Sequence, residues 1–178
     1  GGYHAFVGGR VGSEDLDPPT QGATPGPPAP GPPTPELAGI SPVPPAGFAL
    51  AASRELFEEL GLYLGSDRLS EHQRKTVRRS LLGDGDERSP DGRPPSAVPS
   101  LAPRPGLLRP IVRLLTPAYH PIRFDTQFFL LDWEEASLPE PAIWPGELVD
   151  GDWKRPAEWL DAWRRGDVLI APPVLYIL

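Results

Sequence analysis

Residues 54–62 read Arg-Glu-Leu-Phe-Glu-Glu-Leu-Gly-Leu, and this stretch carries the strongest structural and chemical signal in the chain. On a helix, Glu55, Glu58 and Glu59 stand at positions i, i+3 and i+4, so their carboxylates share one face. Like charges this close repel one another and destabilise a bare helix. Two interpretations follow: a solvated acidic face, or a bound divalent cation, because Mg²⁺ and Mn²⁺ favour carboxylate oxygens.

The surrounding residues predict a helix over 46–61. Apolar side chains recur in it at four-residue steps and predict a second face, which is expected to be buried. These side chains are Phe48, Ala52, Leu56 and Leu60. Gly61 is expected to end the helix, because glycine readily adopts the left-handed conformation found at helix C-termini.

The order of residues in 54–62 resembles the second half of the Nudix box, G-x5-E-x7-R-E-U-x-E-E-x-G-U, where U is aliphatic. The first half is displaced upstream, where Gly8 and Gly9 resemble the glycine pair that opens the box. If Gly9 is the opening glycine, the acidic position falls on Asp15, which precedes Arg54 by 39 positions. The resemblance therefore implies a Nudix box that is split by an insertion.

Residues 17–46 fit this insertion, since they contain 12 prolines among 30 positions and show no apolar periodicity. Such a segment cannot bury enough apolar surface to order itself and is expected to be polyproline-like or disordered. Residues 83–106 are rich in Gly, Pro, Ser and Asp and are predicted to form a second, flexible loop. A split box of this kind resembles the acyl-CoA diphosphatase-like branch of the Nudix hydrolases.

A second segment resembles the same branch. Residues 123–130 read Arg-Phe-Asp-Thr-Gln-Phe-Phe-Leu, in the expected order after the box. The strongly apolar segment 124–133 predicts a strand, and because Phe128–Leu131 place apolar side chains on both of its faces, burial on both faces is expected. Arg123 stands at the entrance of this strand, where it either pairs with Asp125 or binds a substrate phosphate through bidentate hydrogen bonds.

The remaining pattern predicts strands at residues 3–11, 111–116 and 151–154, and helices at 70–82 and 156–165. Ser70 and Gln73 form a capping-box pattern at the start of the first helix, and Gly166 stands just past the end of the second. The basic side chains of the helix at 70–82 are expected to form a solvated face: Arg74, Lys75, Arg78 and Arg79. Strands interleaved with helices indicate the α/β class. The Nudix resemblance implies an α/β/α sandwich with a mixed sheet and long Pro-rich insertions.

The resemblance also implies a site for Mg²⁺ or Mn²⁺. The implied metal ligands are Glu58, Glu59, the carbonyl oxygen of Gly8 and, on a late loop, Glu147. Metal charge at such a site stabilises the charge that develops on phosphorus and orients an attacking water.

Roles for the other box residues follow from the same resemblance. Glu55 is implied as the catalytic base or as a ligand to a further metal. Arg54, four residues before Glu58, is expected to pair with the box carboxylates and to fix their rotamers. Substrate contacts are implied for Gly9, Arg10 and Arg123.

The implied activity is hydrolysis of a nucleoside diphosphate linked to another moiety, X. The branch implies CoA or acyl-CoA as the substrate, cut to 4′-phosphopantetheine and 3′,5′-ADP. Two alternatives stay open: a Nudix pyrophosphatase that acts on ADP-ribose or a dinucleotide, and a non-catalytic Nudix-fold binding module. Bacterial proteins of this branch also resemble fusions to a metallo-β-lactamase-like domain, which makes such a domain an expected partner.

Composition sets outer bounds on these expectations. A chain of 178 residues suits a single domain over 1–178, and the absence of Met suggests a fragment of a longer chain. The net charge of −7 argues against nucleic acid as a partner. Absence of Cys excludes disulfides and thiolate metal sites and fits a cytoplasmic location. No apolar run is long enough to predict a membrane span.

Overall fold

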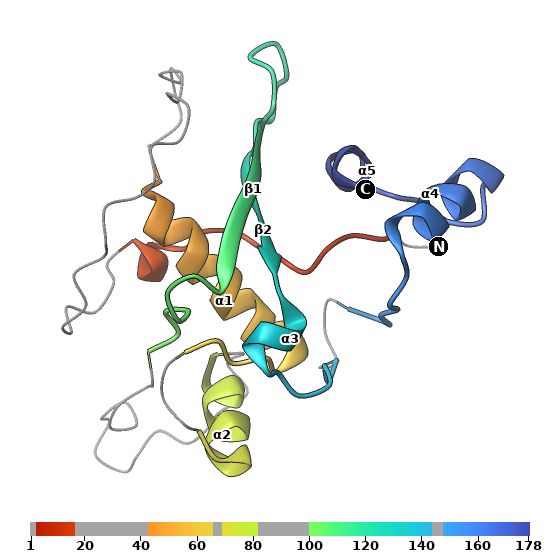
Figure 1. Cartoon of the computed structure of the whole chain (residues 1–178). Helices are drawn as coiled ribbons and strands as arrows, with labels where there is room; N and C mark the ends of the chain where they lie inside the picture. Colours follow the sequence, from red (N-terminus) through yellow and green to blue (C-terminus); the bar gives the residue numbers. More distant parts are fainter. Residues whose placement is uncertain (1–2, 17–42, 66–68, 82–99, 144–147) are drawn as a thin grey trace.

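The computed structural model describes residues 3–16, 43–65, 69–81, 100–143 and 148–178. Its elements, in chain order, are the 3₁₀ helix η1 (Ser13–Asp15), α1 (Pro45–Leu60), α2 (Glu71–Leu81), β1 (Leu108–Leu115), β2 (Asp125–Leu131), α3 (Trp133–Ala136), α4 (Pro156–Arg165) and α5 (Pro172–Ile177). Helices and an antiparallel pair of strands make this a mixed α/β structure, as expected (Figure 1).

The two predicted loops lie mostly outside the described residues. Only residues 43–46 of the expected insertion are described, and α1 already begins at Pro45, so the prediction placed the end of the insertion too late. Proline suits that first helical position because its φ is preset and its missing N–H has no intrahelical partner there. Of the loop predicted at 83–106, residues 100–106 are described, and they contain no helix or strand.

The box helix is confirmed as α1, and Gly61 ends it in the left-handed conformation, with φ 69° and ψ 17°. The expected apolar face is confirmed in part: Phe48 is buried, the other three members are half-buried, and Leu56 packs against the hydrophobic core. Phe57, outside that face, is 0% exposed. The reason is that η1, α2 and β2 all contact α1, so burial is not confined to one stripe. The buried residues of α1 are Gly47, Phe48, Ala51, Ser53, Arg54 and Phe57.

β1 and β2 form an antiparallel pair whose register runs from Leu108 opposite Leu131 to Leu115 opposite Asp125. The register is irregular after Pro110, which has no N–H to donate to the partner strand. β2 is not buried on both faces as predicted: Leu130 is 45% exposed, and the rest of the strand is half-buried. The described residues form no larger sheet that would support packing on both sides.

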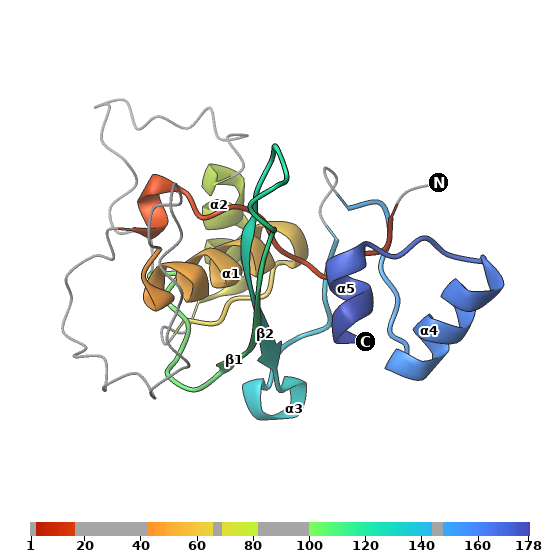
Figure 2. The same cartoon turned by 90° about the horizontal axis from the view of Figure 1, so that it is seen from above.

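The strands predicted at 3–11 and 151–154 do not form among the described residues. Residues 3–11 instead form an extended segment that runs from the α4–α5 side of the molecule to η1 (Figures 1 and 2). Its one bridge joins His4 to Ile170, and further along the segment the ring of Phe6 meets the ring of Phe128 edge-on at 6.4 Å. The segment therefore connects the C-terminal helices to the hairpin and to α1.

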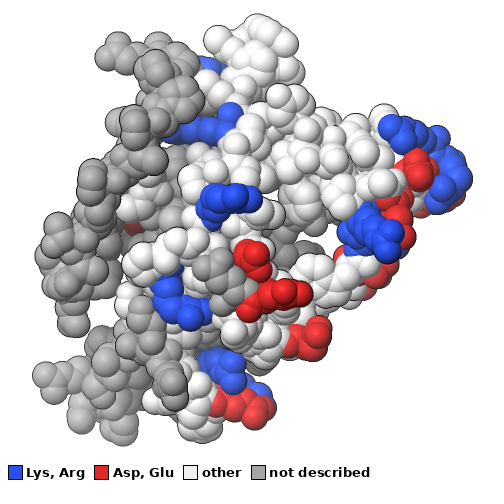
Figure 3. Space-filling view, in the orientation of Figure 1, with Lys and Arg blue, Asp and Glu red and all other residues white. Residues whose placement is uncertain are grey.

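The two other predicted helices are confirmed. α2 begins with the capping box that the sequence predicts, in which Ser70 N–H donates to Gln73 Oε1 at 2.9 Å and Gln73 N–H donates to Ser70 Oγ at 3.2 Å. α4 ends at Gly166, which is left-handed with φ 79°. Over α4, acidic and basic side chains are interspersed (Figure 3), as in the Arg164–Asp161 pair. Among the described residues, no helix is both long and apolar enough to cross a membrane.

Candidate active site

Arg54 is the centre of a buried cluster that joins the segment around Arg10 and Asp15 to α1. Its Nε lies 3.2 Å from Asp15 Oδ1, and its Nη2 lies 3.1 Å from Asp15 Oδ2, so the pair is bidentate. Nη1 contacts Glu58 Oε2 at 2.9 Å and Glu55 Oε1 at 3.0 Å. Nη2 also donates to the carbonyl oxygen of Arg10 at 2.8 Å. One guanidinium thus holds three carboxylates and the backbone of the glycine-rich segment.

Asp15 is positioned by η1 as well as by Arg54. The N–H of Gly12 donates to Asp15 Oδ2 at 2.8 Å, and the N–H of Asp15 donates to the carbonyl of Gly12 at 3.2 Å. Asp15 is 2% exposed, so its charge is screened little by water and depends on these partners. The expected equivalence of Asp15 to the acidic position of the box therefore has a structural counterpart, an ion pair across 39 residues.

Gly9 lies against Glu55. A Cβ atom at Gly9 would collide with the Glu55 carboxylate, whereas a Cβ at Gly8 would meet nothing within 4 Å. A side chain at position 9 would therefore displace the Glu55 carboxylate, and this close approach, not a left-handed φ, is what favours glycine there. Gly9 and the acidic face of α1 therefore meet at this point.

The carboxylates of α1 do not form a solvated face. The side chains of Glu55 and Glu58 are 13% and 16% exposed, and Arg54 is 11% exposed. Burial raises the pKa of the Glu58 carboxyl above its usual range, and the charge of Glu55 adds to this effect, while Arg54 opposes it. These carboxylates are therefore held close together at a cost in desolvation and repulsion that Arg54 partly offsets.

The charge state of Arg54 is fixed by its partners. Burial by itself lowers the pKa of the guanidinium, but the hydrogen bond to Asp15 and the charges of Glu58, Asp15 and Glu55 outweigh it and raise the pKa. Arg54 is therefore a permanent cation in the cluster. This agrees with the expectation that it orients the box carboxylates.

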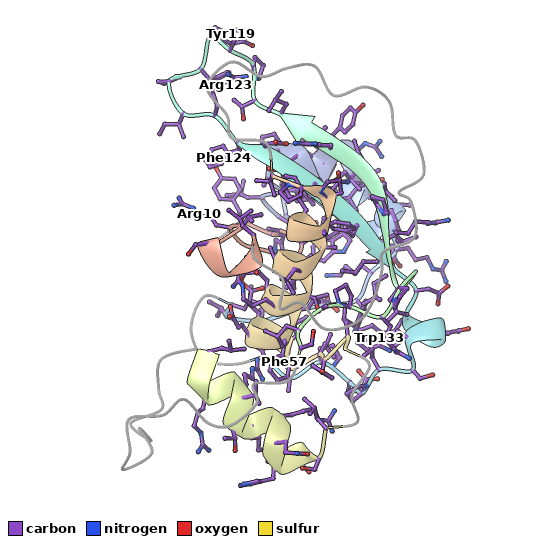
Figure 4. The ribbon with its side chains drawn as sticks, turned by 90° about the vertical axis from the view of Figure 1, so that its left-hand side faces the viewer. Arg10, Phe57, Tyr119, Arg123, Phe124 and Trp133 are labelled. Carbon is purple, nitrogen blue, oxygen red and sulfur yellow. The ribbon has the colours of Figure 1, made fainter. Side chains whose placement is uncertain are left out.

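The structure does not join every predicted site residue to this cluster. Glu147 lies outside the described residues. Arg123 lies near the tip of the β1–β2 hairpin with Tyr119, whereas Arg10 lies beside η1 (Figure 4). Arg123 Nε donates to the carbonyl of Thr116 at 3.1 Å. Of the two alternatives for Arg123, the ion pair with Asp125 is not formed, since Asp125 has another partner, while phosphate binding stays a prediction.

Asp125 instead pairs with Arg113 of β1. Arg113 Nε and Nη2 lie 2.7 and 2.6 Å from the two Asp125 oxygens, and the Arg113 guanidinium stands 5.0 Å above the ring of Phe48. Register explains the difference, since Asp125 lies opposite Leu115 and reaches the side chain two positions earlier on the partner strand. This pair anchors the hairpin to α1, and a sequence without known strand pairing could not reveal it.

Arg78 was expected on a solvated basic face, but it is 5% exposed. Its Nε donates to the carbonyl of Glu58 at 2.7 Å, and its Nη2 donates to the carbonyl of Ala142 at 3.1 Å. Burial lowers the pKa of this guanidinium, which still donates to two backbone oxygens. In sequence the only signal is that Arg78 lies between Val77 and Leu81, the two apolar residues of an otherwise polar helix.

The chemistry of this donor set fits a hard divalent cation, because Glu55, Glu58 and Glu59 supply carboxylate oxygens. Within the described ranges, however, no three acidic, His or Cys side chains are grouped as a metal site. Arg54 occupies one oxygen each of Glu55 and Glu58. The expectation of a divalent cation here therefore rests on the carboxylate chemistry of the residues and on the close approach of Glu55 to Gly9.

No protein-family model matches this chain, and no curated protein or solved structure matches it significantly. The Nudix assignment remains a prediction that rests on the residues of the box and on their arrangement.

Proposed function

We propose that this protein is a Nudix-type diphosphatase that hydrolyses a nucleoside diphosphate linked to X. CoA or acyl-CoA is the proposed substrate, and 4′-phosphopantetheine and 3′,5′-ADP are the proposed products. The observation that carries the proposal is the Arg54 cluster, which gathers Asp15, Glu55 and Glu58 with the backbone of Arg10. A non-catalytic binding module would have no evident need to bury three carboxylates around one cation.

The proposed metal is Mg²⁺ or Mn²⁺, held by Glu58, Glu59 and the carbonyl oxygen of Gly8, with Glu147 as a further ligand. When bound, the metal supplies positive charge that stabilises a phosphoryl transition state and favours an ionised water nucleophile. Glu58 suits this role, because a carboxyl whose pKa is raised by burial gains stability when a cation is placed beside it.

The remaining roles follow from the contacts of each residue. Glu55 is the proposed base or a ligand to a further metal, and its position is limited by the backbone of Gly9 on one side and by Arg54 on the other. Arg54 positions carboxylates and does not react itself, since it stays protonated. Gly9, Arg10 and Arg123 are the proposed substrate contacts, with Arg123 binding a phosphate that is already charged in the ground state.

A substrate panel tests the proposal. CoA, an acyl-CoA, ADP-ribose and NADH are each incubated with the protein and Mg²⁺ or Mn²⁺, and products are identified by mass spectrometry. Release of phosphopantetheine from CoA at the highest rate supports the proposed substrate class. Preferential cleavage of ADP-ribose or NADH to AMP assigns a different Nudix activity, and absence of any cleavage rejects the enzyme proposal.

A further inference from the structure

The last turn of α1 is held by a neighbouring helix and by a distant loop. The final carbonyl groups of an α-helix have no partner within the helix. Here the carbonyl of Glu58 accepts a hydrogen bond from Arg78 Nε at 2.7 Å, and the carbonyl of Leu60 accepts one from the N–H of Ala142 at 2.9 Å. Two of these orphan carbonyls are therefore satisfied from outside α1.

Arg78 joins these two contacts into one unit. Its Nη2 donates to the carbonyl of Ala142 at 3.1 Å. The same guanidinium therefore binds the last turn of α1 and also the loop residue, Ala142, whose N–H binds Leu60. The third nitrogen, Nη1, lies directly over the residue that ends the helix: a Cβ at Gly61 would come within 3.0 Å of it. A cation at a helix C-terminus is also favoured by the helix dipole.

The location of this unit matters because helix ends fray. Glu58 and Glu59 stand in the final turn of α1, whereas Arg54 and Glu55 stand one turn earlier and are already fixed by Asp15 and Gly9. The Arg54 contact holds one oxygen of the Glu58 side chain, but it does not hold the backbone of the last turn. Catalytic groups must be held to within a fraction of an ångström by their supporting residues.

We propose that Arg78 is a positioning residue that fixes the turn carrying Glu58 and Glu59 for metal binding. This inference rests on the proposed function. Arg78 does not touch substrate in this account, and it acts through the Glu58 backbone. Its burial at 5% exposure and its two hydrogen bonds to backbone carbonyls distinguish it from Arg79, the next residue of α2, which is exposed.

The test compares Mn²⁺ binding by the full chain, by Arg78→Gln and by the matched control Arg79→Gln, using electron paramagnetic resonance of free Mn²⁺. Loss of a supporting contact behind a metal ligand weakens metal binding about tenfold or more, and this is the expected result for Arg78→Gln. Arg79→Gln is expected to bind as the unchanged protein does. In the active enzyme, the Arg78 variant is expected to lower kcat more than it raises KM.

A conservative variant keeps the inference testable if Arg78→Gln does not fold. Arg78→Lys keeps the charge and can reach one carbonyl, so its Mn²⁺ affinity is expected to lie between those of the unchanged protein and Arg78→Gln. Full Mn²⁺ affinity in a folded Arg78 variant, together with a lower melting temperature, overturns the inference and leaves the proposed function standing. Absence of Mn²⁺ binding by the unchanged protein overturns both.

Discussion

Arg54 and Asp15, 39 residues apart, form a bidentate ion pair with N–O distances of 3.2 and 3.1 Å. The Asp15 side chain is 2% exposed and that of Arg54 is 11% exposed. A cation and an anion that are buried together depend on each other, since either one alone would be a desolvated charge. This pair fixes the position of η1 relative to α1.

Arg54→Ala is expected to destabilise the protein by about 3 kcal/mol, because it leaves several carboxylates without their cation in a partly buried cluster. Urea unfolding followed by circular dichroism measures the change. The control is Lys75→Ala, which removes an exposed pair with Glu71 in which Lys75 is 60% exposed. That variant is expected to lose less than about 1 kcal/mol. Equal losses of free energy of unfolding in the two variants would show that the buried Arg54 cluster stabilises the fold no more than an exposed ion pair does.

Gly9→Ala is expected to lower turnover about tenfold with a small change in stability. The new methyl group must push the Glu55 carboxylate aside, and a flexible side chain can move without unfolding the protein. Gly8→Ala provides the comparison, since a Cβ there meets open space, and its loss of turnover is expected to be clearly smaller. Steady-state kinetics and melting temperatures of both variants test this prediction. A larger loss of turnover in Gly8→Ala than in Gly9→Ala would contradict the expected contact between Gly9 and Glu55.

Glu59→Gln is expected to lower turnover about a hundredfold or more and to leave the metal-free protein as stable or slightly more stable. The first effect follows from loss of a metal ligand, and the second from reduced repulsion within the acidic face. Glu71→Gln, on α2, is the control, since the Glu71 side chain is 75% exposed. Turnover of Glu59→Gln within a few-fold of the unchanged protein would remove Glu59 from the metal site.

Arg113→Lys is expected to cost about 1–2 kcal/mol of stability, because an ammonium group cannot replace the bidentate contact with Asp125. The contact joins β1 to β2, and the same guanidinium stands over Phe48 of α1. Arg109→Lys, at an exposed position of the same strand, is expected to change stability by less than about 0.5 kcal/mol. Thermal unfolding of the two variants separates the outcomes, and similar melting temperatures would argue that the pair is not structural.

Deletion of residues 19–41 is expected to preserve both folding and hydrolysis. The described residues on either side of this segment approach each other at Gly47. A Cβ atom placed on Gly47 would lie 3.6 Å from the Leu16 side chain and 3.2 Å from the Val43 side chain. Closing a shorter loop between such points is favourable by only about 0.6 kcal/mol per halving of its length. The variant is checked by circular dichroism and by the CoA assay. Loss of the fold or of all activity would mean that the deleted residues contribute to the domain or to the site.

The sequence predicted the parts of this structure that local chemistry determines. Gly61 and Gly166 end helices where the left-handed conformation is needed, and Ser70 with Gln73 caps α2, so three helices were located to within one or two residues. Asp15 was singled out by its spacing from Gly9 in the resemblance, whereas its bidentate pairing with Arg54 is seen only in the structure. In each case the information lies within a few residues or in a fixed motif.

The remainder depends on contacts that local patterns do not encode. Burial of Phe57 and Arg78 results from packing of α1 against several elements, and the partner of Asp125 depends on strand register. Residues 3–11 were predicted as a strand because Phe6 and Val7 are apolar, yet the segment makes a single bridge through His4. Two adjacent apolar residues do not specify a strand partner, and in the structure Phe6 is 47% exposed and Val7 is half-buried.

The most direct test of the central claim is Mg²⁺-dependent release of 3′,5′-ADP from CoA, measured side by side for the unchanged protein and for Asp15→Asn. The account predicts that the unchanged protein requires the metal, and that Asp15→Asn is slower by about tenfold or more, because Arg54 then loses the charge that holds it in register with the box. A folded protein that hydrolyses neither CoA nor any other nucleoside diphosphate derivative in the presence of Mg²⁺ or Mn²⁺ would contradict the account.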